Sequence, residues 1–398
     1  MVLESSEAGN KSVNNRNNDN SIKFAFVGDL FLGGEFIPYA EKHRIDLLRP
    51  FHLISNYLSE VDILFVNFEG PICSGLNKRE DVTAIISNHP SIIEFLKKFK
   101  ICVLNLANNH IMDYGPEGLD KTLMHLDANK LHYIGAGCKD IEADKELIIE
   151  CKGKRVAFIA YTTDEVHVRS VIARNDKPGC ASYLDVDKVV RRIQDLKNKA
   201  DVICVSLHWG HEYYQYPTPS QIIIAHSLAE AGADYIIGHH PHVIQGTENY
   251  NNSLIMYSLG NFFFSPFKST RGRLQYQKPL TKEFMIVCTA FCASETIGYD
   301  LLGGTVNKEY CLIPFVGADL QRFIQKATSL SHPISDPDYD KFFEAYQVKR
   351  KKELLNENLI EAFRKLSRMS LRDFLTTIGP SDITRNIGRF FKILFKAS

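Results

Sequence analysis

The sequence lacks an excess of either charge: 47 Lys and Arg residues balance 47 Asp and Glu residues in a chain of 398. A dedicated nucleic-acid-binding protein normally carries a basic excess, so this balance argues against nucleic acid as a partner. The sequence also lacks a run of about 18 apolar residues that could span a bilayer. A GxxxxGK[ST] phosphate loop is missing too, which argues against an NTPase.

Paired cysteines are missing as well. The nine cysteines include no CxxC motif, and several lie in apolar runs, which is typical of buried free thiols in a reducing compartment. The first twenty residues lack the basic start and apolar stretch of a signal peptide. We therefore expect a cytoplasmic protein in which residues 1–20 are a disordered tail.

What the sequence does contain is an alternation of short apolar segments and helical patterns over residues 21–317. This alternation predicts an α/β fold whose sheets are covered by helices. The later strands lack helices between them, so part of the structure should be an antiparallel sheet, and residues 318–398 are predicted to be a helical accessory region. The predicted strands span 22–28, 62–66, 101–106, 155–161, 201–207, 234–238, 253–260, 284–291 and 309–315, and the predicted helices span 50–60, 91–99, 116–129, 187–199 and 219–231.

Polar side chains follow most of the early strands at the point where each strand ends. In open α/β sheets, ligands bind beyond the carboxyl ends of the strands. Carboxylate, amide and imidazole groups together suit one or two divalent cations such as Mn, Fe, Zn, Mg or Ca. These side chains are Asp29, Asn67, Glu69, Asn105, Asn108, Asn109, His110, His208, His211, Glu212, His239, His240 and His242.

Each of these residues taken alone also has a structural explanation. Asp29 could cap the segment that follows it, and Asn108 with its neighbour could simply turn the chain. His240 and His242 are a stronger signal, because residues i and i+2 of an extended segment face the same side. His239 is better explained by packing than as a third ligand. The metal site is therefore predicted from the whole set rather than from any one residue.

Six motifs occur in a fixed order along the chain: VGDLFLGG, VNFEGPI, NLANNHIMDYG, HWGHEY, GHHPHVIQG and YSLGNFFF. In that order they resemble the CapA family, which is related to poly-γ-glutamate capsule biosynthesis and belongs to the calcineurin-like metallophosphoesterase superfamily. The resemblance covers about residues 22–265. It implies an α/β/β/α sandwich of two sheets flanked by helices, with a metal site at one edge.

The resemblance also implies which residues hold two cations. The implied ligands are Asp29, Glu69 and His242 for the first cation, and Glu69, Asn109, His208 and His240 for the second. Phe31 stands where the superfamily usually has a histidine ligand. The first position would therefore be weak, filled by a harder ion such as Ca or Mn, or empty. His110 would be the proton donor or anion stabiliser beside the substrate.

Further residues are candidates for the surroundings of this site. Asp113 either holds the second ring nitrogen of His110 or faces a helix dipole, and the sequence favours neither. Glu212 is a catalytic candidate because it closely follows a ligand strand. The substrate-binding candidates are Asn67, Asn108, Trp209, His211 and Asn261.

Three functions remain open at this stage. The first is hydrolysis, in which a cation activates water and His110 protonates the leaving group; the bond would be a phosphoester, or a peptide or isopeptide bond of an anionic polymer. The second is epimerisation of a peptide residue, with His110 moving the Cα proton. The third is a non-catalytic role as a factor that binds or assembles capsule polymer.

The C-terminal region differs in charge from the rest of the chain. Residues 341–398 contain 13 Lys and Arg residues against 6 Asp and Glu residues. Residues 381–398 combine an apolar helical stripe with basic residues, a pattern that fits either packing on the core or peripheral contact with an anionic membrane. A homo-oligomer formed through the accessory helices is a further hypothesis.

Overall fold

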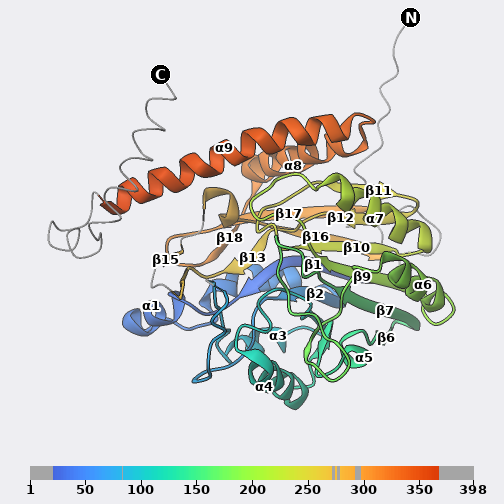
Figure 1. Cartoon of the computed structure of the whole chain (residues 1–398), viewed down its shortest axis with the longest axis horizontal. Helices are drawn as coiled ribbons and strands as arrows, with labels where there is room; N and C mark the ends of the chain where they lie inside the picture. The colour runs from blue at the N-terminus through green and yellow to red at the C-terminus, as the bar shows by residue number, and fades with distance from the viewer. Residues whose placement is uncertain (1–20, 83, 271–273, 276–277, 292–296, 367–398) are drawn as a thin grey trace, which may run out of the picture. The chain divides into compact units, whose positions relative to one another are not determined.

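The computed structural model describes residues 21–82, 84–270, 274–275, 278–291 and 297–366. Two large β-sheets dominate this part of the chain, and helices lie around them (Figure 1). The first sheet has the order β18-β17-β16-β1-β2-β3-β4, with β13 also paired to β1, and the second has the order β11-β12-β10-β9-β7-β6. The expected α/β class with two sheets is confirmed.

The strand bounds follow the apolar segments of the sequence closely. The first sheet consists of β1 (Ile22–Phe31), β2 (Ile63–Phe68), β3 (Ile101–Asn105), β4 (His132–Ile134), β13 (Asn261–Phe264), β16 (Glu283–Phe291), β17 (Tyr299–Val306) and β18 (Leu312–Pro314). The second consists of β6 (Leu147–Cys151), β7 (Lys154–Tyr161), β9 (Val202–His208), β10 (Tyr235–His239), β11 (Thr247–Tyr250) and β12 (Ser253–Met256). Two short pairs join β5 (Ala136–Gly137) to β8 (Gly179–Cys180) and β14 (Phe267–Lys268) to β15 (Leu274–Gln275).

Helices connect the parallel strands. The α-helices are α1 (Phe36–His43), α2 (His52–Leu58), α3 (Ile92–Leu96), α4 (Gly115–Ala128), α5 (Asp140–Ala143), α6 (Val186–Leu196), α7 (Pro219–Ala231), α8 (Gly317–Ser331) and α9 (Tyr339–Leu366). Three 3-10 turns are η2 (Arg49–Phe51), η3 (Pro279–Lys282) and η4 (His332–Ser335). α7 begins at a capping box, in which Thr218 and Gln221 bond each other's backbone, as the Thr-Pro-Ser-Gln sequence favours. α7 packs on β10 and α4 packs on β4, so each sheet carries a helix.

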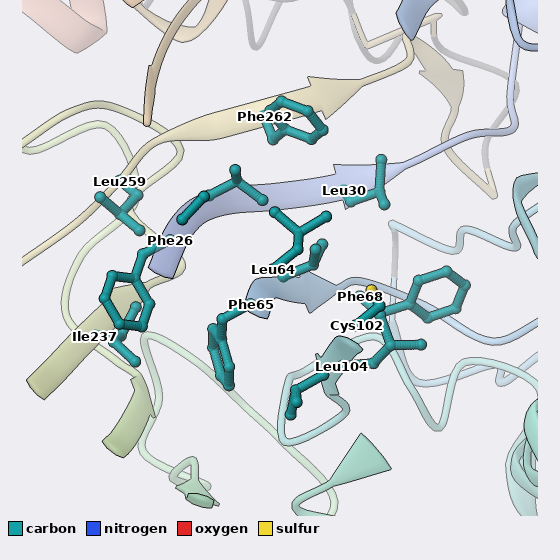
Figure 2. Packing of buried hydrophobic residues seen from close by; sticks show 14 of the residues in the cluster. Phe26, Leu30, Leu64, Phe65, Phe68, Cys102, Leu104, Ile237, Leu259 and Phe262 are labelled. Carbon is teal, nitrogen blue, oxygen red and sulfur yellow. The ribbon is translucent and has the colours of Figure 1, made fainter. Parts of the chain in front are cut away.

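The main core lies between the two sheets. Figure 2 shows Phe26 of β1 and Phe65 of β2 on the same side of the first sheet, with Ile237 of β10 next to Phe26. The ring of Phe26 lies 5.0 Å from that of Tyr235, and the ring of Phe65 lies 5.9 Å from that of Phe158. Burying aromatic side chains from both sheets supplies a large apolar stabilisation. This packing fixes the two sheets against each other and therefore fixes the edge where both groups of strands end.

Several sequence predictions are refined by the structure. The strand predicted over 253–260 is shorter, because β12 ends at Met256 in the second sheet and the chain then crosses to the first sheet, where β13 pairs with β1. The expected antiparallel region is confirmed by β16, β17 and β18, which pair in succession. β17 was not predicted; two of its eight residues are the paired glycines Gly303 and Gly304, which weaken a strand pattern.

Contacts divide the chain into two units, residues 1–339 and 340–398. α8 therefore belongs to the first unit, whereas the sequence analysis placed it in the accessory region. The reason is its buried face: Phe323, Ala327 and Leu330 are buried, and a Cβ on Gly303 of β17 would lie 2.3 Å from the Phe323 ring. In the second unit the structure describes α9, where Arg350 bonds Glu353 and Glu357. The predicted stripe over 381–398 lies outside the described residues.

Among the helices of the described ranges, none is long and apolar enough to cross a membrane. Within the same ranges eight cysteines are free thiols, four of them buried. The four buried cysteines are thus packing residues of the core, as their apolar surroundings in the sequence indicated.

Candidate metal centre

The register of the parallel strands lines up polar residues at one edge of each sheet. In the first sheet Asp29 of β1 pairs with Asn67 of β2, and Asn67 pairs with Asn105 of β3. In the second sheet His208 of β9 pairs with His239 of β10. Each row lies at the carboxyl end of its strands, where ligands bind in sheets of this kind. One edge thus supplies carboxylate and amide groups, and the other supplies imidazoles.

Two glycines let the chain cross close behind these rows. A Cβ at Gly28 would lie 1.9 Å from the carbonyl oxygen of Gly260, and a Cβ at Gly238 would lie 1.9 Å from that of Tyr257. Any larger residue would push the 257–260 segment away. The close approach allows the Asp29 amide to donate to the Gly260 carbonyl over 2.9 Å. Asn261 is thereby brought beside Asp29, with which it pairs in register.

Asn67 organises the carboxylates. Its side-chain amide donates to Asp29 Oδ1 over 2.8 Å and to Glu69 Oε2 over 3.3 Å, and its Oδ1 accepts from Asn105 over 3.0 Å. Asn67, Asp29 and Glu69 are all fully buried. The sequence analysis placed Asn67 among the substrate-binding candidates, but it contacts the predicted ligands and holds two of their oxygens in place.

Glu69 leaves one oxygen directed into the centre. Its Oε1 lies 3.8 Å from His242 Nε2 and 3.9 Å from His110 Nε2, distances too long for hydrogen bonds. Among the described residues this buried oxygen has no hydrogen-bond partner, and neither has the buried Nδ1 of His240. Leaving such groups unpaired inside a protein is costly. A divalent cation would satisfy them, and their oxygen and nitrogen chemistry fits Mn, Fe or Zn.

The predicted ligands fall into two groups around this centre. Ligand atoms of Asp29, Glu69 and His208 lie within 4.8 Å of one another, and so do ligand atoms of Glu212, His240 and His242. Asn109 contacts the first group, because its Oδ1 lies 2.9 Å from His208 Nε2. The structure thus brings together all six predicted metal ligands and adds Glu212, which was predicted as a catalytic residue.

His240 and His242 reach the centre by a route that the sequence did not predict. β10 ends at His239, and the next residues are bends in which His240 has φ 96° and His242 has φ 56°. The assumption of an extended segment was therefore wrong, although both imidazoles do point to one centre, with ring centroids 6.0 Å apart. Positive φ values at non-glycine residues cost energy and persist where function requires them.

His110 and Asp113 form a close pair. The Asp113 carboxylate lies 2.7 Å from His110 Nδ1 and also accepts from the backbone amide of Ile86 over 2.9 Å. This geometry favours the first of the two roles considered for Asp113, in which it holds the imidazole. Burial alone would lower the pKa of His110, but the nearby Asp113 and Glu69 carboxylates outweigh it and raise the pKa. The protonated ring can thus serve as an acid.

The charges of the centre are distributed unevenly. Burial, with the Asp29 carboxylate, raises the pKa of Glu69 to about 8. Burial lowers the pKa of His240 to about 4 and that of His208 well below its usual value, so both rings are neutral, as metal ligands must be. Burial would also lower the pKa of His242, but without a cation Glu69 and Asp29 raise it to about 10, so a cation that binds this ring must displace its proton.

Three predicted substrate-binding residues have structural contacts instead. Trp209 is fully buried and donates its indole N–H to the Tyr257 carbonyl over 3.1 Å. Asn108 is buried and bonds the backbone of Phe68 and His110. Asn261 lies beside the centre, where its Oδ1 faces His242 Nδ1 at 2.9 Å and its amide donates to Thr281. The substrate-binding role of the three stays a prediction.

His211 lies at the margin of the centre, half-buried, with its ring 3.9 Å from that of His167. No motif predicted His167, whereas His239 is fully buried with its ring stacked on that of Phe65, as its expected packing role requires. The backbone carbonyl of His167 lies 3.1 Å from His240 Nε2, a contact that no motif signals. His239 Nδ1 lies 3.5 Å from Asp29 Oδ1.

A family described as "Bacterial capsule synthesis protein PGA_cap" matches residues 23–266, more than half of the chain. The chain belongs to this family. Among PGA_cap relatives, the "Capsule biosynthesis protein CapA" of Bacillus anthracis is 34% identical over 260 residues, covering 63% of this chain and 62% of that protein. The "PGA biosynthesis protein CapA" of Bacillus subtilis (strain 168) is 33% identical over 248 residues, covering 62% and 64%. The resemblance to the CapA family is confirmed, while the matched region spans less than two thirds of either relative.

Solved structures are more distant from this PGA_cap chain. A hypothetical protein from Thermus thermophilus is 14% identical with a TM-score of 0.42, covering 70% of this chain and 98% of that one. A putative 5'-nucleotidase from Staphylococcus aureus, in complex with alpha-ketoglutarate, is 16% identical with a TM-score of 0.41, covering 78% and 58%.

Proposed function

We propose that this PGA_cap protein is a metal-dependent hydrolase that cleaves a peptide, isopeptide or phosphoester bond of an anionic polymer. The observation that carries the proposal is the unpaired, buried Oε1 of Glu69, with the Nε2 atoms of His242 and His110 at 3.8 and 3.9 Å from it. Family membership supports a capsule-related polymer as substrate.

A cation held by Asp29, Glu69, Asn109 and the histidines would supply Lewis acidity toward substrate oxygens and toward water. The remaining work falls to residues of the chain. Asn67 holds Asp29 and Glu69 in fixed positions, because its amide donates to both carboxylates. Burial of these groups excludes bulk water and strengthens their electrostatic interactions.

His110 supplies the proton for the leaving group. Its Nδ1 faces Asp113 at 2.7 Å, which orients the ring and leaves Nε2 directed toward the centre. The raised pKa keeps a proton available on the ring near neutral pH. General acid catalysis by a positioned imidazole contributes roughly 10²- to 10⁴-fold to a rate.

The test is His110→Ala, with the exposed His125 of α4 changed to Ala as a matched control. We expect His110→Ala to lower turnover of bis(p-nitrophenyl) phosphate or γ-linked oligoglutamate by roughly 10²-fold or more. Metal content, measured by plasma mass spectrometry, should match that of the wild type in both variants.

Three outcomes would contradict the proposal. Loss of bound metal from His110→Ala would make His110 a ligand rather than an acid. Deuterium from solvent at a Cα of oligoglutamate, without scission, would replace hydrolysis with epimerisation. A metal-loaded wild type that binds oligoglutamate without cleaving any of these substrates would leave a binding or assembly role.

A further inference from the structure

The turn after β9 brings the carboxylate of Glu212 close to the predicted metal ligands, although the family resemblance does not make Glu212 a ligand. Gly210 with φ 84° and Tyr213 with φ 68° bend the chain directly after His208 and Trp209. The Tyr213 amide donates to the Pro241 carbonyl over 2.7 Å, which ties this turn to the loop that carries the two histidines. As a result, Glu212 has a carboxylate oxygen within 4.8 Å of ligand atoms of both His240 and His242.

His240 and His242 each bond an outer partner through one ring nitrogen and leave the other ring nitrogen on the side of the centre. The Nε2 of His240 is hydrogen-bonded to the His167 carbonyl at 3.1 Å. The fully buried Nδ1 is left without a hydrogen-bond partner among the described residues. His242 uses Nδ1 on Asn261 and Asp29, at 2.9 and 3.1 Å, so Nε2 faces the centre. Fixing one ring nitrogen by an outer partner is how proteins orient a ligand imidazole.

The side chain at position 31 offers no ligand atom. Phe31 stands where the superfamily usually has a histidine, and its ring lies 5.1 Å from that of Phe264, which lies 4.9 Å from the ring of His242. Phe31, Ile86 and Phe264 form a small apolar cluster, against which Phe267 packs. Position 31 therefore packs in an apolar cluster and supplies no donor atom to a cation.

We propose that Glu212 is a metal ligand which, with His240 and His242, holds one cation, while Asp29, Glu69 and His208 hold another. This division differs from the one implied by the superfamily, in which His240 and His242 belong to different cations. The inference rests on the proposed metal-dependent function. One carboxylate and two imidazoles with an open position are a known donor set for a catalytic divalent cation.

Exposure distinguishes the two positions. His240 and His242 are buried but Glu212 is exposed, whereas Asp29, Glu69 and His208 are all fully buried. A cation on Glu212 therefore exchanges with solvent more readily and is removed first by a chelator. The position on Asp29, Glu69 and His208, with two carboxylates, is the tighter of the two.

The experiment is calorimetric titration of Mn²⁺ into chelator-stripped, full-length protein, with circular dichroism to verify folding. The wild type should bind two equivalents of different affinity. Glu212→Gln should weaken the looser equivalent by at least tenfold and leave the tighter one, and Asp29→Asn should do the reverse. Glu165→Gln is the matched control, since Glu165 is an exposed carboxylate on the loop that carries His167.

The outcomes separate this inference from the proposed function. If Glu212→Gln binds two equivalents of Mn²⁺ with the affinities of the wild type, Glu212 is not a ligand, and the hydrolase proposal is unaffected. Two equivalents that respond as expected, in a protein that cleaves no substrate, would support the ligand and reject the hydrolase. A wild type that takes up no Mn²⁺ would reject both.

Discussion

The two ends of β2 carry two buried carboxylates with opposite surroundings. Asp62 directly precedes β2, and its side chain accepts from the Lys23 amide and pairs with the ammonium groups of Lys100 at 3.3 Å and Lys152 at 2.6 Å. Glu69 directly follows β2 and has one oxygen bonded to Asn67 and one left unpaired. The strand between them is buried throughout.

The difference shows in the pKa of each group. Burial would raise the pKa of Asp62, but the Lys152 ammonium and the Lys23 amide outweigh it and lower the pKa. Burial raises the pKa of Glu69 to about 8. A carboxylate whose partners all come from the protein stabilises the fold. A buried carboxylate without such partners costs stability and indicates a site that a ligand completes.

The variant with the largest expected effect is Glu69→Gln, which keeps the shape of the side chain and removes its charge. We expect it to lower hydrolysis at least 10³-fold and to reduce metal content by one equivalent, because the position on Asp29, Glu69 and His208 loses one of its two carboxylates. Without cation, the variant should unfold at the same temperature as the wild type or higher, since a buried group with a raised pKa is removed.

Metal analysis and calorimetry in chelator check this prediction. A Glu69→Gln protein that keeps its full metal content would show that Glu69 is not a ligand. A clear drop in the unfolding temperature of the cation-free variant would show that Glu69 serves the fold, as Asp62 does, and the contrast between the two ends of β2 would disappear.

A smaller effect is expected from Asn67→Ala, which removes the donor to both Asp29 and Glu69. Groups that orient metal ligands typically contribute 10- to 100-fold to affinity, so Mn²⁺ binding should weaken by roughly that factor. Asn198→Ala, at an exposed amide, is the matched control. Equal affinities in the two variants would mean that the carboxylates keep their positions without Asn67.

Much of this centre was accessible from the sequence, for a physical reason. Asp29, Asn67 and His208 lie at the ends of parallel strands, so the pairing register alone places them at one edge. The apolar runs predicted those strands. The polar residues at which the runs end are also the residues that supply the ligands. Position along a strand therefore translates directly into position in space.

The remainder depends on chain segments that have no repeating pattern. The positive φ values at His240 and Tyr213 determine where the imidazole and Glu212 point, and no periodicity encodes them. Asn261 reaches His242 because the chain crosses from the second sheet to the first after β12, so that β13 pairs with β1. Trp209 follows a ligand directly yet is fully buried in packing. The positions of these residues depend on turns and crossovers, and the conformations of the turns depend on tertiary contacts.

The smallest expected effect belongs to the other end of β2. Asp62→Asn should leave metal content unchanged and lower the free energy of unfolding at neutral pH by about 1.5 kcal/mol, the usual contribution of a hydrogen bond to a charged group. Asp164→Asn is the matched control, because its pair with Arg174 is exposed and such pairs contribute little.

The difference in unfolding free energy between the wild type and Asp62→Asn should depend on pH. A carboxyl group with a lowered pKa in the folded state contributes stability that is fully present above its unfolded pKa of about 3.9 and is lost as pH falls through the folded value. The lowered pKa of Asp62 thus predicts that the gap between wild type and Asp62→Asn in urea unfolding is constant near neutral pH. Below about pH 4 the gap should close, because the wild-type carboxyl becomes protonated and loses its attraction for Lys152. A gap that persists unchanged into acid would mean that shape and hydrogen bonding, rather than charge, make Asp62 a structural residue, and the electrostatic contrast with Glu69 would then fail.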